Sequence, residues 1–176
     1  MDLRIVKTRL SIKKAFLKLL GKSRAEEIKV KDICDEANIN KTTFYKHYHD
    51  SSVLMNEIEN RAVDKIVDKF EERELLFADT KAYMSALYYL LEREVETLRL
   101  IFRGKTEIFC AKLEERLKSF YPEKDRDVEQ GVVLSFVLGG CLLVVRDYLF
   151  SDEHDAKTIV DCTSEIANNV IDDITE

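Results

Sequence analysis

The chain has 176 residues, of which 45% are hydrophobic and 35% are charged, with five glycines and one proline. This length suits one domain or a small pair, and so little glycine and proline excludes a collagen-like or loop-rich all-β chain and favours helices. The net charge of −6, taken alone, argues against nucleic-acid binding.

The charge is distributed unevenly along the chain. Residues 1–50 carry 12 Lys and Arg against 7 Asp and Glu, whereas residues 51–176 carry 16 against 27, so the two parts have net charges of +5 and −11. Residues 3–25 contain eight basic side chains and no acidic one. Such asymmetry indicates a basic module joined to an acidic body. A solvated lysine face is the alternative, although it would usually carry some glutamates among the lysines.

Helical periodicity runs through nearly the whole sequence. A first apolar stripe precedes Gly21, a residue suited to the left-handed position that stops a helix. We therefore expect an all-α fold of about nine helices: an N-terminal three-helix, helix-turn-helix DNA-binding domain (1–50) and a C-terminal antiparallel helical bundle (51–176). Pro122 breaks the bundle. After the first helix, the spacing of apolar residues predicts further helices over residues 30–37, 41–48, 52–77, 80–92, 96–103, 105–120, 126–150 and 155–174.

The sequence gives no indication of export or of a membrane span. No signal peptide is recognisable, and the most apolar stretch, Val132–Val145, has 14 residues where a membrane helix needs about 20. The four cysteines are scattered and form no C-x-x-C pair, which predicts free thiols in a reducing compartment rather than disulfides or zinc. We expect a cytoplasmic protein without a metal or cofactor.

The most informative stretch is Val30–Tyr48, which predicts a helix, a three-residue turn and a second helix. Asn40 is a strong N-cap for the second helix, since its side chain can accept a hydrogen bond from a first-turn amide. Ile39, one residue before the cap, can pack on Phe44 as a hydrophobic staple. Phe44 and Tyr48 then share the inner face of the second helix.

The outer face of this second helix is rich in hydrogen-bond donors and has no acidic residue. A helix N-terminus with free amides beside hydroxyls and cations suits phosphate contact and entry into the major groove, as in a helix-turn-helix dock. An ordinary helix corner with a polar surface is the alternative. The outer residues are Lys41, Thr42, Thr43, Tyr45, Lys46 and His47.

This stretch resembles the DNA-binding motif of the TetR family of bacterial transcriptional regulators, and the resemblance covers about residues 5–70. Three residues depart from the typical motif. Asn38 replaces the turn glycine and Asn40 the cap serine, and both substitutes are physically competent. Ser51 replaces a lysine, which leaves one phosphate contact to a backbone amide. The matching residues are Val30, Ile33-Cys34, Ala37-Asn38-Ile39-Asn40, Thr43-Phe44-Tyr45-Lys46-His47-Tyr48 and Leu54.

The resemblance implies a DNA-binding regulator, commonly a repressor released from a pseudo-palindromic operator by a small-molecule effector. A transcriptional activator, or a helical protein-interaction module without DNA binding, is the alternative. By the same resemblance Tyr45, Lys46 and His47 would hold DNA phosphates, while Lys41, Thr42 and Thr43 would lie near bases and backbone. Further contacts could come from Arg4, Lys7 and Arg9, and such basic residues would make binding salt-sensitive.

The resemblance further implies that the last two helices pair two subunits into a homodimer. The stretch 126–150 is apolar almost all round and must be covered on every side. Gly139-Gly140 is costly inside a helix, which indicates a close helix–helix approach. Burial wholly within one subunit is the alternative. The expected dimer interface contains Val133, Val137, Gly140, Val144, Ile159, Ile166 and Val170.

Aromatic residues are dense between the motif and the last helices, and they either line an effector pocket or simply form the core. They are Tyr83, Tyr88, Tyr89, Phe102, Phe109, Phe120 and Tyr121. The sequence names no ligand for such a pocket.

An enzyme is disfavoured by the pattern of potential catalytic residues. His47 and His49 would not share a helix face, and His154 lacks metal-ligand spacing. The sequence has neither a nucleophile elbow nor a phosphate-cradling glycine loop.

Overall fold

The computed structural model describes residues 3–71, 75–103, 105–121, 127–149 and 155–175, so Pro122 and His154 lie outside the described residues. Within those ranges the chain forms helices and turns and no strand, which confirms the all-α prediction. The α-helices are α1 (Leu3–Leu20), α2 (Val30–Ala37), α3 (Lys41–Tyr45), α4 (Ser51–Val67), α5 (Thr80–Arg93), α6 (Val95–Ile101), α7 (Thr106–Lys118), α8 (Val128–Val144) and α9 (Ala156–Thr175).

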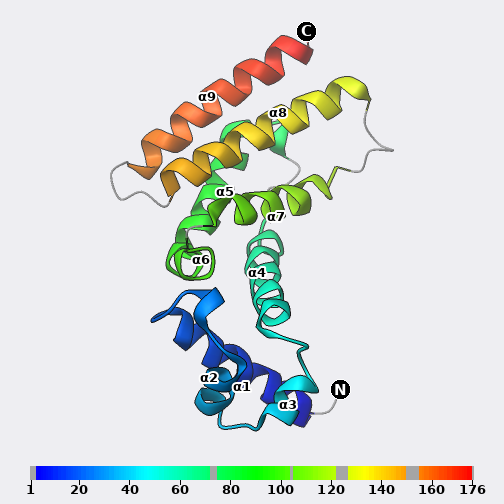
Figure 1. The fold of residues 1–176 in the computed structure, drawn as a ribbon. Coiled ribbons are helices and arrows are strands. Elements are labelled where there is room, and N and C mark those ends of the chain that lie inside the picture. Colours follow the sequence, from blue (N-terminus) through cyan, green and yellow to red (C-terminus); the bar gives the residue numbers. More distant parts are fainter. Residues whose placement is uncertain (1–2, 72–74, 104, 122–126, 150–154, 176) are drawn as a thin grey trace.

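The molecule is elongated, with the N-terminal helices and the last two helices far apart (Figure 1). Figure 1 shows α1, α2 and α3 together at one end and α8 and α9 side by side at the other, with α4 running between them. Helix α4 packs on α7, and α5 packs on α9. A second link between the ends is an ion pair of Lys105, just before α7, with Glu26 in the 3₁₀ turn Ala25–Glu27.

The three N-terminal helices enclose a small core of their own. Ile12 and Phe16 of α1 are fully buried, as are Ile33 of α2 and Phe44 of α3. The predicted left-handed conformation of Gly21 is wrong, because its φ lies outside the positive range and its N–H bonds back to Leu17 as in a helix. The chain leaves α1 through ordinary right-handed turns instead.

Several predicted helices, including α3 and α4, are shorter in the structure. Helix α3 ends at Tyr45 rather than at residue 48, and α4 ends at Val67 rather than at residue 77. After α4 the amide of Phe70 bonds to the carbonyl of Val67 in a tight turn. This turn carries the Phe70 ring into the core, where it meets the Tyr83 ring with centroids 4.8 Å apart. Burial of Phe70 therefore takes precedence over the continuing helical pattern.

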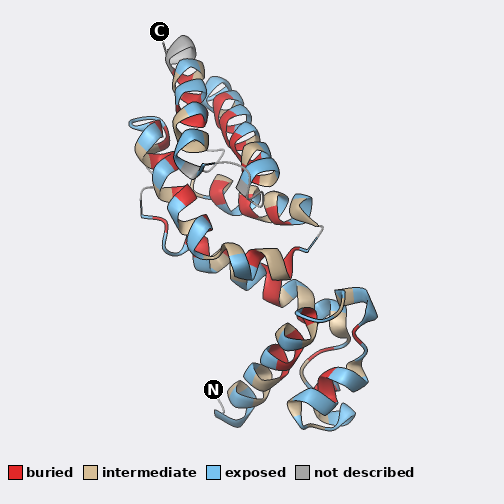
Figure 2. Ribbon diagram, turned by 90° about the vertical axis from the view of Figure 1, so that its left-hand side faces the viewer, coloured by how far each residue is buried: buried red, intermediate tan, exposed pale blue. Residues whose placement is uncertain are grey.

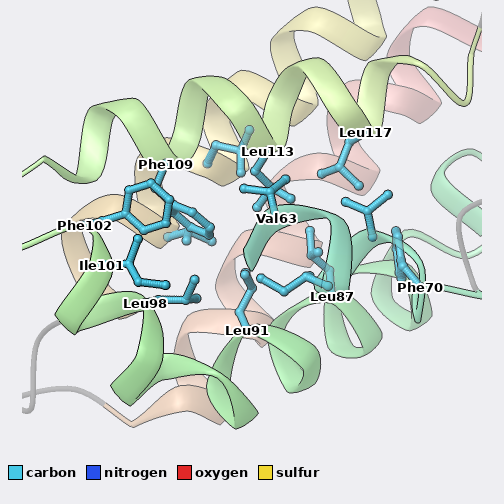
Figure 3. Close-up of a cluster of buried hydrophobic side chains, with 14 of the residues drawn as sticks. Val63, Phe70, Leu87, Leu91, Leu98, Ile101, Phe102, Phe109, Leu113 and Leu117 are labelled. Carbon is cyan, nitrogen blue, oxygen red and sulfur yellow. The ribbon is translucent and has the colours of Figure 1, made fainter. Parts of the chain in front are cut away.

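The body is held by an apolar core where α4, α5, α6 and α7 converge (Figure 3). Phe102 after α6 and Phe109 of α7 stack with centroids 5.0 Å apart and are both buried. Each fully buried side chain of this size contributes about 1.5–3 kcal/mol of transfer free energy. The labelled core residues are Val63, Phe70, Leu87, Leu91, Leu98, Ile101, Phe102, Phe109, Leu113 and Leu117.

Helix α8 is capped at its start and covered on one side only. Asp127 accepts a hydrogen bond from the Gln130 amide at 2.8 Å and caps the helix, which passes into a π-helical turn, Val145–Leu149. Val133 and Leu134 are buried, whereas Val132 is exposed; Figure 2 shows such alternation of buried and exposed turns along the helices. The expectation that this helix is covered on every side is therefore not met within one subunit.

The helical stretch through α8 is longer than the apolar run in the sequence. From Val128 to Tyr148 it is long and apolar enough to cross a membrane by length and composition alone, and 39% of its most apolar window is buried in the molecule. The buried part packs on α7 and α9. Core helices of soluble proteins also pass this test, so it is weak evidence for a span.

Candidate nucleic-acid interface

The turn between α2 and α3 has the backbone that its sequence predicts. Asn38 has φ 52° and ψ 51°, and it is the one non-glycine residue with positive φ in the described part of the chain. The amide of Ile39 bonds to the carbonyl of Cys34 at 3.0 Å and closes the end of α2. Asparagine tolerates this left-handed conformation better than most residues, so the absence of the usual glycine is accommodated.

The start of α3 is capped as predicted. The Asn40 side chain accepts a hydrogen bond from the Thr43 amide at 2.7 Å. Behind the cap, Ile39 packs against the core that contains Phe44 and Tyr48, whose rings lie 5.8 Å apart. These contacts fix α3 on its inner side and leave its outer side to solvent.

The predicted DNA-contacting side chains lie on this outer side. Lys41, Thr42 and Lys46 are exposed, and Thr43 and His47 are half-buried. Tyr45 is 55% exposed, although its ring edge rests on Phe44 with centroids 5.6 Å apart. The structure therefore brings all six residues of the motif to one end of the molecule, away from α8 and α9 (Figure 1).

The three basic residues of α1 that were expected to contact DNA fall into two sets. Arg4 and Lys7 are exposed. Arg9 instead turns toward α4, where its Nη2 lies 2.6 Å from Oε2 of Glu57. A phosphate contact by Arg9 would compete with this ion pair, so the structure gives Arg9 an internal partner that the sequence did not indicate.

Arg9 belongs to a cluster with Lys13 and Glu57, two residues that the sequence pattern did not indicate as partners. Lys13 is only 8% exposed and places its Nζ 2.5 Å from Oε1 of Glu57. Glu57 thus holds two cations of α1 from its place on α4. The pairing spans 44 residues for Lys13 and 48 for Arg9, a separation at which no local pattern connects the partners.

The N-cap residue of α4, Asp50, places a carboxylate at the edge of this surface. Asp50 accepts hydrogen bonds from the amides of Ser52 at 2.8 Å and Val53 at 2.9 Å. Hydrogen bonds from the Ser52 hydroxyl and from His49 hold the pKa of Asp50 well below its usual range. The amides of Ser52 and Val53 are therefore already hydrogen-bonded to Asp50. Neither is open to make the phosphate contact that a backbone amide was expected to supply in place of the lysine replaced by Ser51.

Most of the body's aromatic residues are core. Tyr83, Tyr88, Phe102 and Phe109 are buried, Phe120 and Tyr121 are partly buried against the core, and Tyr89 is exposed. Burial of these four side chains is what the core interpretation predicts.

An apolar groove of about 560 Å³ runs between α8 and α9. Of the residues expected at a dimer interface, six line it and Val133 does not, while Val133 and Val137 are both only 3% exposed. A Cβ added to Gly139 or Gly140 would meet no atom within 4 Å, so the close helix approach expected at these glycines does not occur inside the subunit. The six are Val137, Gly140, Val144, Ile159, Ile166 and Val170.

Two thiols of the body are poorly suited to nucleophilic chemistry. Burial raises the pKa of Cys110 to about 11 and that of Cys141 to about 12, so both remain protonated near neutral pH. Among the residues that the structure describes, no three His, Cys, Asp or Glu side chains gather in a way that could hold a metal ion.

No family model matches the chain. It is 37% identical over 68 residues to the uncharacterized HTH-type transcriptional regulator YxbF of Bacillus subtilis, a match that covers 38% of this chain and 18% of that protein's length. The structure superposes on a TetR transcriptional regulator from Streptococcus agalactiae with a TM-score of 0.69 and 19% identity, over 94% of this chain and 96% of the other. The chain has the TetR-regulator fold.

Two other solved structures share the TetR-regulator fold with this chain. The dihydroxyacetone kinase operon activator DhaS matches 96% of each chain with a TM-score of 0.59 and 19% identity. A TerR/AcrR-family regulator from Aquifex aeolicus covers 93% of this chain and 99% of its own, with a TM-score of 0.54 and 21% identity. The resemblance found in residues 5–70 thus extends, as a fold, over nearly the whole chain, and the three solved structures named above are described as transcriptional regulators or an operon activator.

Proposed function

We propose that this protein is a homodimeric transcriptional regulator that binds an operator through α2 and α3. The observation that carries the proposal is the outer face of α3. On a capped and anchored helix, it combines the exposed side chains of Lys41, Thr42, Tyr45 and Lys46 without a carboxylate. A surface of donors and cations on a protruding helix-turn-helix fits the major groove and its phosphates.

The lengths of the elements suggest how this surface divides its contacts. Helix α3 has only five residues, so its first residues, Lys41 and Thr42, would reach base edges. Tyr45, Lys46 and His47 lie at and just beyond its end, where they would hold phosphates. Arg4 and Lys7 of α1 would add contacts from the side, whereas Arg9 is assigned an internal role below.

The second copy of the chain would cover the groove between α8 and α9. Val132, Phe136 and Ile166 are exposed large apolar side chains along these two helices. Glycine inside a helix costs about 1 kcal/mol relative to alanine, and neither Gly139 nor Gly140 is compensated by a close contact within the subunit. The α8–α9 pair of a second copy would bury this face, and its helices could approach closely at Gly139 and Gly140. Val132 and Phe136 then replace Val133 in the expected interface.

A two-fold dimer of this kind would bind a pseudo-palindromic operator. Its two recognition helices would lie about 34–36 Å apart, or at a multiple of that spacing, on one face of the duplex. The charge of −11 on residues 51–176 would repel the DNA and so favour the orientation in which residues 1–50 approach it.

The direction of regulation is proposed from the family's common mode, a cytoplasmic repressor released by a small-molecule effector. Activation is the second candidate, because one protein of this fold, DhaS, is named as an operon activator.

Salt titration of binding to a mixed-sequence DNA duplex tests the proposal. The logarithm of the binding constant should fall linearly with the logarithm of salt concentration, with a slope of about −0.9 per phosphate contacted. Lys46→Gln should weaken binding and reduce the magnitude of the slope by about one. Lys157→Gln, which removes an exposed lysine from α9, serves as the matched control. Absence of binding at low salt would overturn the proposal.

A further inference from the structure

We propose that Glu57 of α4 is a positioning residue for the DNA interface, which ties α1 and the end of the recognition helix to α4 in a single arrangement. The inference rests on the proposed function, since DNA is the ligand whose recognition it affects. Glu57 itself would not touch DNA. It would act through Arg9 and Tyr48.

Glu57 uses both of its carboxylate oxygens on α1. Oε1 lies 2.5 Å from Nζ of Lys13, and Oε2 lies 2.6 Å from Nη2 of Arg9. Arg9 and Lys13 are four residues apart and so share one face of α1. Nε of Arg61, one turn further along α4, adds a third cation at 3.4 Å. Two helices are therefore joined at one carboxylate whose side chain is 21% exposed.

The same cluster reaches the recognition helix through Tyr48. The Arg9 guanidinium lies 5.3 Å from the centre of the Tyr48 ring, a cation–π distance. The Tyr48 hydroxyl is buried and makes no hydrogen bond of good geometry. It nevertheless lies close enough to Arg9 and Glu57 for both residues to influence its pKa. Burial raises the pKa of Tyr48, so its phenol stays neutral beside the carboxylate.

Ring contacts continue the path to the outer surface. Tyr48 packs on Phe44 at 5.8 Å, and Phe44 meets Tyr45 edge-on at 5.6 Å. Tyr45 is one of the side chains that face solvent on the proposed DNA surface. A shift of Arg9 would therefore move Tyr48 and, through Phe44, the outer face of α3.

Positioning and simple electrostatics predict opposite effects of removing this carboxylate. Loss of an acidic group near a DNA-binding surface raises the local positive potential and should strengthen binding to any duplex. If Glu57 positions the interface, its loss should weaken recognition of the correct sequence in particular. The ratio of operator affinity to mixed-sequence affinity separates the two effects, because a uniform electrostatic gain cancels in it.

The experiment uses the full-length protein and an operator selected from random duplexes with the unaltered chain. Glu57→Gln should lower the ratio of operator to mixed-sequence affinity about tenfold, comparable to one mismatched base pair. Glu36→Gln is the matched control, because it makes the same charge change on α2 and breaks only the Lys18 pair at 2.6 Å. Its ratio should stay within about twofold of the unaltered protein, as expected for an exposed pair.

A conservative variant covers the case in which Glu57→Gln does not fold. Arg9→Lys keeps the charge but loses the planar group that bonds Glu57 and stacks on Tyr48, so the ratio should fall about threefold. Thermal unfolding and sedimentation verify the fold and the assembly of each variant. The inference is overturned, and the proposed function is not, if the ratio of operator to mixed-sequence affinity is unchanged in every folded variant. The same holds if the ratio falls as much in Glu36→Gln as in Glu57→Gln. Failure of the unaltered protein to bind any duplex overturns the proposed function, and the inference with it.

Discussion

Glu57 and Glu59 stand two residues apart on α4 and pair in opposite directions. Glu57 binds Arg9 and Lys13 of α1, whereas Glu59 faces α7, where its Oε2 lies 3.5 Å from Nζ of Lys112. Residues two apart on a helix point about 200° away from each other, so the two carboxylates use opposite faces of α4. Helix α4 is thus held by cations from α1 on one face and from α7 on the other.

The body side of this arrangement should be important for stability. Lys112 also donates to Oδ1 of Asn56 at 2.7 Å and of Asn60 at 2.5 Å, and Glu59 is only 8% exposed. Lys112→Met would leave a nearly buried carboxylate without its cation, and we expect a loss of about 2–4 kcal/mol in the free energy of unfolding. Chemical denaturation at a fixed protein concentration measures it.

Arg116→Met provides the comparison for Lys112. Arg116 lies one turn further along α7 and pairs with Asp64 of α4 at 2.9 Å, but both side chains are well exposed. Its removal should cost less than about 1 kcal/mol. Equal losses in the two variants would show that burial of Glu59 does not govern the strength of this contact.

The Glu57 ion pairs on the α1 side of α4 should make stability depend on pH in the acid range. Burial of Glu57 alone would raise its pKa, but hydrogen bonds from Lys13 and Arg9, together with the nearby Tyr48 hydroxyl, outweigh burial and lower the pKa to about 2 from an ordinary 4.5. The folded state therefore binds the proton less tightly than the unfolded state. The resulting stabilisation is present above pH 4.5 and is lost as the pH falls toward 2.

Comparison with Glu57→Gln isolates this contribution. The unaltered protein should be more stable than the variant by about 1–2 kcal/mol at neutral pH, after allowance for solvent around the partly exposed side chain. The difference in unfolding free energy should shrink steadily between pH 5 and pH 2.5, because only the unaltered protein has the titrating carboxyl. A difference that stays constant across this range would contradict the assignment.

Tyr45→Ala should weaken DNA binding without affecting the fold. The side chain is more than half exposed, so its loss removes little core packing beyond the edge of Phe44. We expect about tenfold lower affinity for mixed-sequence duplexes, the usual scale for one phosphate-contacting side chain. Tyr89→Ala is the matched control, since Tyr89 is 57% exposed on α5 of the body. Fluorescence anisotropy gives both affinities, and unchanged binding by Tyr45→Ala would refute its role.

Much of the helix-turn-helix could be predicted from the sequence because its determinants are local. Asn38 and Asn40 set the turn and the cap through their own backbone and through the amide of Thr43, three residues away. The partners of Glu57 are 44 and 48 residues distant, and no periodicity encodes that pairing. The sequence therefore indicates only that Arg9 is a basic residue of α1, whereas the structure pairs it with Glu57 of α4 and places it beside Tyr48.

Helix α8 shows a second limit of prediction from the sequence. Its composition indicated that every side must be covered, but composition does not distinguish cover by the same chain from cover by another copy. The structure shows which side chains the chain itself covers: Val133 is buried, and Val132, one residue away, is exposed. Neighbouring residues on a helix point about 100° apart, so a shift of one residue places a different side chain in the proposed interface. Only the three-dimensional packing shows which side chains remain exposed to form it.

Phe136→Glu should convert the proposed dimer into a monomer. Phe136 is 63% exposed and lines the groove between α8 and α9, where a charge would have to be buried when the second copy covers it. An unpaired buried carboxylate costs several kcal/mol, enough to lower the association constant at least a hundredfold.

Leu143→Glu controls for the added charge on the same helix. Leu143 is comparably exposed at 52% but is absent from the lining of the groove, so its substitution should leave the dimer intact. Sedimentation velocity at micromolar concentration resolves the two species. Operator affinity should fall with dimerisation in Phe136→Glu, because each monomer would then bind a single half-site. If both variants stayed dimeric, the α8–α9 groove would not be the subunit interface, and the exposed apolar face of these helices would need another partner.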